Sequence, residues 1–146
     1  MRTFMIAVML IVVTGLTGCS YLFYPRAGEY MEKAKGPTAV DTILNLIPML
    51  EASSKAAHGQ DYQTAMDDLH NQFHALHDAF CDVEKPLSET PTFAKAKTIE
   101  KELWTIFKRL WWNRNDQSLR TVHLDLFEKR LGELRDTLQP LKGKAT

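Results

Sequence analysis

DYQTAMDDLHNQFHALHDAFCDV, residues 61–83, repeats its apolar residues every three or four positions. That spacing places them on one face of a helix, whereas a half-buried strand would alternate every second residue. The same spacing occurs in residues 38–57, 91–113 and 118–139, and turn-forming residues separate these segments. Strand and hairpin patterns are nearly absent. The sequence therefore predicts an all-α fold, in the form of an up-down-up-down four-helix bundle.

Several residues at the segment ends have the chemistry of helix caps. Thr90 followed by Pro91 matches an N-cap with proline in the first helical position. Asp61 is expected to cap the second segment. A shorter helix is expected over residues 27–35, and Gly36-Pro37 ends it.

The N-terminus has the pattern of an export signal. Arg2 precedes an unbroken apolar run over residues 4–13, which is shorter than the roughly 20 residues needed to span a bilayer. Leu16-Thr17-Gly18-Cys19 then resembles the lipobox of bacterial lipoproteins. The resemblance covers residues 1–19 and implies transfer of diacylglycerol to the Cys19 thiol, cleavage before Cys19 and acylation of the new N-terminus. Ser20 is not the Asp that retains lipoproteins at the inner membrane, so the resemblance favours the outer membrane.

This signal divides the chain into a signal peptide (1–18), a lipidated N-terminus and tether (19–36) and a helical bundle domain (37–146). Without Arg2 the chain has 17 Lys and Arg against 18 Asp and Glu, so its charge does not favour nucleic acid. Lipidation of Cys19 leaves Cys81 without a partner for an internal disulfide. We therefore expect Cys81 to be buried, ligated or paired with another molecule.

A stripe of histidines runs along the second segment, through His70, His74, His77 and Cys81. Spacings of four, three and four residues keep the stripe within about 60° of the helix circumference. Imidazole and thiolate bind divalent ions and copper, and residues 56–84 contain six carboxylates but no Lys or Arg. The stripe is therefore a candidate metal site. The alternative is that residues of intermediate polarity occupy the edge of a buried helix face.

Tryptophan and arginine gather at the end of the third segment, in Arg109, Trp111, Trp112 and Arg114. A helical projection places Trp111 on the flank of the core and Trp112 on the side away from it. An outward Trp among arginines is typical of a partner-binding hot spot or a membrane interface. The alternative is that the helix end distorts and returns Trp112 to the bundle.

Catalytic motifs are absent from the sequence. HNQFH, residues 70–74, has Asn71 where the zinc-protease pattern requires Glu, and there is no phosphate-binding glycine loop or nucleophile elbow. We therefore predict a protein without enzymatic activity. It is expected to be a lipid-anchored envelope protein that faces the periplasm and binds another envelope protein, with no nucleic-acid partner. The alternative function is buffering or delivery of copper, zinc or nickel through the histidine stripe.

Overall fold

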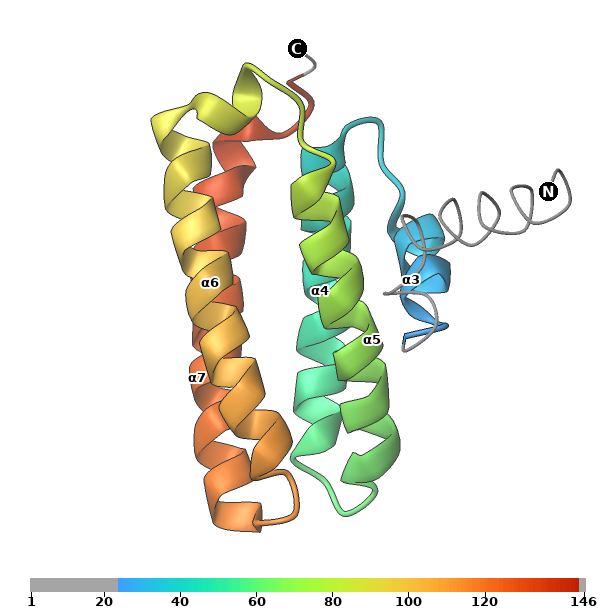
Figure 1. Ribbon diagram of the computed structural model, residues 1–146. Coiled ribbons are helices and arrows are strands. Elements are labelled where there is room, and N and C mark those ends of the chain that lie inside the picture. The colour runs from blue at the N-terminus through green and yellow to red at the C-terminus, as the bar shows by residue number, and fades with distance from the viewer. Residues whose placement is uncertain (1–23, 145–146) are drawn as a thin grey trace, which may run out of the picture.

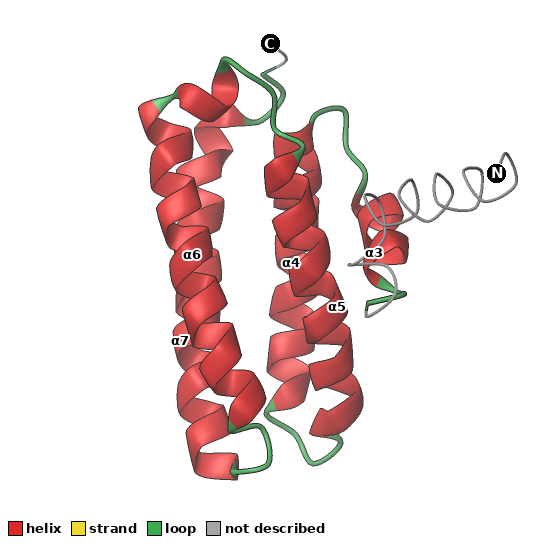
Figure 2. Cartoon of the chain, viewed as in Figure 1, coloured by secondary structure: helices red, strands yellow, loops and turns green. Residues whose placement is uncertain are grey.

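The computed structural model describes residues 24–144, so the signal peptide and Cys19 lie outside the described residues. Within that range every regular element is a helix, and the prediction of an all-α fold is confirmed (Figure 2). The elements are α3 (Ala27–Ala34), α4 (Ala39–Ala57), α5 (Tyr62–Cys81), α6 (Pro91–Trp112) and α7 (Gln117–Leu138), with short 3₁₀ turns η1 (Leu87–Glu89) and η2 (Gln139–Leu141).

The long helices pack as a helical bundle. Helices α4 and α5 lie side by side, as do α6 and α7, and α4 also packs against α7 (Figure 1). The α4–α5 and α6–α7 loops lie at one end of the bundle, and the connection between α5 and α6 lies at the other (Figure 1). Helix α3 packs on the outside of α5 and α4.

Side chains that accept hydrogen bonds from the backbone fix where three of these helices begin. Thr90 accepts from the Phe93 amide as predicted, Thr38 accepts from the Asp41 amide, and Asp116 accepts from the Leu119 amide. Asp61 occupies the N-cap position of α5 as expected, but its side chain makes no capping hydrogen bond. Its backbone (φ −85°, ψ 37°) is outside the extended region that directs an N-cap side chain toward the first turn.

The core consists of aromatic and aliphatic side chains from all four long helices. The largest fully buried side chains are Phe73, Phe93, Phe127, Ile43, Leu46, Ile47, Leu50, Met66, Leu69, Leu76, Leu103 and Leu110. Burial of this apolar surface is the main stabilising contribution to the fold. Among residues 24–144, no helix combines the length and the apolar composition that a membrane span requires.

Candidate functional site

Aromatic rings and histidines fill the space between α5 and α6. The backbones of these two helices have few contacts with each other, so large side chains bridge them. We call this layer the α5–α6 seam, and it consists of Tyr24, His70, His74, His77, Trp104, Phe107 and Trp111. Three predicted metal ligands, His70, His74 and His77, therefore lie within it.

His74 is the most perturbed residue of the seam. Its ring stacks on Tyr24, with the ring centroids 3.4 Å apart and the planes inclined by 19°. Burial, together with the neighbouring His70 and His77, lowers the pKa of His74 to about 4. Its Nε2 is buried and has no hydrogen-bond partner within the described chain. His74 is therefore neutral at neutral pH.

The other two histidines have different surroundings. His70 lies 4.2 Å from Trp111 and 5.3 Å from Phe107, measured between ring centroids, and burial lowers its pKa. His77 is half-exposed, and its Nδ1 lies 2.9 Å from Oε1 of the buried Glu100. The seam thus holds His70 by ring packing and His77 by a hydrogen bond from another helix.

Cys81 is exposed and free, so burial is excluded from the three outcomes expected for it. Desolvation raises the pKa of the Cys81 thiol, and the charges of Asp78 and Asp82 raise it further. The thiol form is therefore favoured over the thiolate that binds metals. Across residues 24–144, no three or more His, Cys, Asp and Glu side chains form a group that could hold a metal ion.

The predicted tryptophan site divides into a partly buried part and an exposed part. Arg114 lies over the Trp111 ring, 4.3 Å from its centroid, and donates a 2.7 Å hydrogen bond to the Trp111 carbonyl. These contacts fix the end of α6 locally, while Trp111 reaches His70 of α5 across the seam. Trp112 projects outward with 81% of its surface exposed, as the helical projection predicted, and Arg109 is also exposed.

A row of exposed apolar side chains lies on α7, and our sequence analysis missed it. Leu119, Val122 and Leu126 are 43%, 51% and 46% exposed. Their spacing of three and four residues places them on one face of α7, away from the buried Phe127. This second apolar stripe was the signal that could have revealed them. We refer to these three side chains and Trp112 as the apolar surface; α7 begins five residues after Trp112.

Arg120 is a second residue that sequence reasoning missed. It is buried, its Nε donates to the Ala57 carbonyl at 3.1 Å, and its Nη1 donates to the Arg114 carbonyl at 2.7 Å. Its guanidinium also lies 3.8 Å from the centroid of the Tyr62 ring. Arg120 thus joins α4, α5 and the α6–α7 turn at the end of the bundle that carries Trp112.

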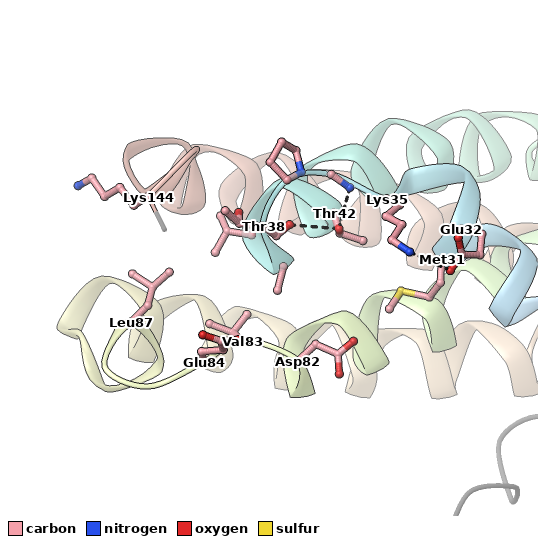
Figure 3. Close-up of a pocket in the computed structure, with 14 residues that line it drawn as sticks. Met31, Glu32, Lys35, Thr38, Thr42, Asp82, Val83, Glu84, Leu87 and Lys144 are labelled. Atoms are coloured by element: carbon pink, nitrogen blue, oxygen red, sulfur yellow. Dashed lines mark hydrogen bonds and ion pairs between the residues drawn. The ribbon is translucent and has the colours of Figure 1, made fainter. Parts of the chain in front are cut away.

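An open groove of about 530 Å³ lies at the opposite end of the bundle, beside the α3–α4 connection (Figure 3). Lys35, Lys144, Glu32 and Asp82 contribute charges of both signs to its lining. The Thr42 hydroxyl accepts from the Gly36 amide and donates to a backbone carbonyl. These hydrogen bonds hold the connection itself, so the hydroxyl is already used within the fold.

No protein-family model, no curated protein and no solved structure matches the chain. Two features of the described residues bear on its function. One is the α5–α6 seam, whose histidines are packed among rings, and the other is the apolar surface of Trp112 and α7.

Proposed function

We propose that this chain is a lipid-anchored, non-catalytic binding module of the bacterial cell envelope, attached by Cys19 to the periplasmic side of the outer membrane. Its domain is an up-down-up-down four-helix bundle, which the pairing of α4 with α5 and of α6 with α7 supports. Its partner is another envelope protein, which binds the apolar surface.

The observation that supports this proposal most directly is that four large apolar side chains are exposed, namely Trp112, Leu119, Val122 and Leu126. Within residues 24–144 these are the large hydrophobic side chains that remain exposed, and they lie on consecutive helices. The three on α7 share one helix face, and exposed apolar side chains that share a face mark interaction sites more often than scattered ones do. Tryptophan and arginine dominate binding hot spots, and Arg109 is exposed three residues before Trp112.

The metal-binding alternative has less support from the geometry. His74 stacks on Tyr24, and His77 is hydrogen-bonded to Glu100 on the neighbouring helix. An ion at His70, His74, His77 and Cys81 would have to displace these contacts. Binding of a partner protein needs no such displacement, because the side chains of the apolar surface are already exposed.

The test is site-specific photo-crosslinking of the full-length protein in intact cells. A photoreactive residue replaces Val122 or Leu126, and a matched control places it at the exposed Lys55 on α4. We expect a discrete crosslinked species at Val122 and Leu126 but not at Lys55. We also expect Trp112→Ala to reduce the yield at Leu126 by about tenfold, as for loss of a hot-spot tryptophan.

Two results would contradict the proposal. One is equal crosslinking at Lys55, Val122 and Leu126, because the partner would then show no preference for the apolar surface. The other is a full yield at Leu126 in the Trp112→Ala variant. Expression level and far-UV circular dichroism of each variant exclude misfolding as the cause of a lost product.

A further inference from the structure

The outer face of α6 carries a row of lysines. Lys97, Lys101 and Lys108 are exposed, and a helical projection places them within about 40° of one another, opposite the buried Leu103. We call these three residues the lysine face. Trp112 lies at the end of the same side of the helix, about 20–60° from these lysines in the projection.

The lysine face has no compensating acidic residues on its own helix. Glu100 is buried and directed at His77, and Glu102 pairs with Arg130 of α7 at 3.2 Å. Lys97, Lys101 and Lys108 form no ion pair within residues 24–144. Two of them contact rings: Lys97 lies 5.4 Å from the Phe93 centroid and Lys108 lies 6.0 Å from the Trp104 centroid. Lys97 also acts electrostatically on Cys81 at the end of α5.

The tether to Cys19 begins beside this face. Tyr24 stacks on His74, and the His74 ring lies 5.6 Å from Trp104, the residue that Lys108 approaches. Cys19 precedes Tyr24 by five residues, which span at most about 18 Å even when fully extended. A lipid on Cys19 therefore holds the membrane surface close to the α5–α6 seam and the lysine face.

We propose that the lysine face docks on the anionic phospholipid surface of the membrane that holds Cys19. The inference depends on the lipid anchor of the proposed function. Lysines near an anionic bilayer each strengthen association by about fivefold, and a short tether keeps them within the range of the surface potential. Because that tether keeps the lysine face near the membrane, we assign the face to a lipid surface and not to a protein partner.

The charges of α5 favour the same orientation. Asp67, Asp78 and Asp82 project from the outer side of α5, on the other side of the seam from the lysine face. An anionic surface attracts the α6 side and repels the α5 side. The domain is thus oriented with α6 toward the lipid.

The experiment is an amine-labelling footprint of the full-length lipidated protein in vesicles. One set of vesicles contains phosphatidylcholine with phosphatidylglycerol, and the other contains phosphatidylcholine alone. A water-soluble acylating reagent modifies lysines, and mass spectrometry measures the rate of labelling at each lysine.

We expect Lys97, Lys101 and Lys108 to react several-fold more slowly in the anionic vesicles, with the protection lost in high salt. Lys55 and Lys129 are exposed controls on other helices and should react equally in both.

Equal labelling rates at the lysine face in both vesicle types would overturn the proposal. A Lys101→Glu/Lys108→Glu variant tests it again, because its remaining Lys97 should lose the protection. If the anchor itself fails, the protein does not co-float with phosphatidylcholine vesicles. If that unanchored full chain floats with the anionic vesicles alone, the result still supports docking of the lysine face on anionic lipid. If it floats with neither vesicle type, the docking proposal is overturned.

Discussion

Arg120 connects parts of the chain that are remote in sequence. Its guanidinium satisfies the carbonyl of Ala57 at the end of α4 and that of Arg114 in the α6–α7 turn. A buried arginine at this place also meets the negative end of the α4 dipole. Few residues of similar size can fill the site, since lysine lacks the planar fork that reaches two acceptors.

Arg120→Leu is expected to lower the free energy of unfolding by about 2–4 kcal/mol, because the buried Ala57 carbonyl and the partly buried Arg114 carbonyl lose their charged donor. Urea unfolding followed by far-UV circular dichroism measures the change. Arg135→Leu is the matched control on the same helix, since exposed Arg135 pairs with Glu51 and should contribute less than about 1 kcal/mol. Equal losses in both variants would show that the Arg120 contacts do not stabilise the fold.

His74 should make stability depend on pH in a defined direction. Its pKa is about 4 in the folded chain and about 6.5 when unfolded, so the unfolded chain binds more protons between these values. The stabilisation of the fold that depends on neutral His74 is fully present above about pH 6.5 and is lost as the pH falls toward 4. After allowance for partial solvation, we expect a loss of about 1–2 kcal/mol.

Thermal unfolding of the native chain and of His74→Gln at about pH 7.5 and 4.5 checks this prediction. The variant cannot titrate at position 74, so its midpoint should fall less between the two pH values. His70, whose pKa is also lowered, accounts for part of the remaining decrease. An identical decrease in both proteins would rule out His74 as its source.

At the scale of elements, α6 begins where its local sequence requires. Thr90 accepts from the Phe93 amide at 3.2 Å, and Pro91 occupies the first turn, where a missing amide costs nothing. Thr90→Ala is expected to lower the free energy of unfolding by about 1 kcal/mol. Thr105→Ala is the control, because that exposed hydroxyl bonds only within its helix, and the expected change is within about 0.5 kcal/mol. If Thr90→Ala and Thr105→Ala lowered the free energy of unfolding equally in chemical denaturation, the capping role of Thr90 would be contradicted.

At the scale of the whole molecule, attachment to the membrane depends on one residue outside the described range. Cys19→Ser removes the thiol that the lipobox resemblance assigns to diacylglycerol. Several acyl chains hold a protein firmly, whereas three lysines alone bind weakly and reversibly. We expect most of the variant to leave the membrane fraction in a salt wash, while the native chain remains. Retention of the variant after the wash would contradict the anchor, and the mass of the native N-terminal peptide provides a second readout.

The fold class and the helix limits could be predicted because both depend on neighbours in the sequence. The expected segment 61–83 became Tyr62–Cys81, and 91–113 became Pro91–Trp112. The outward direction of Trp112 followed from the same local periodicity. Periodicity and capping act within one or two helical turns, so the amino-acid sequence is sufficient for them.

The surroundings of the site residues could not be predicted in this way. The stacking of Tyr24 on His74, the bond between His77 and Glu100 and the burial of Arg120 join residues that are 23 or more positions apart. Such contacts depend on how the helices pack, and packing sets the burial that lowers the His74 pKa and raises that of Cys81. The histidine stripe was visible in the sequence, but the partners of each ring come from helices that meet only when the chain has folded.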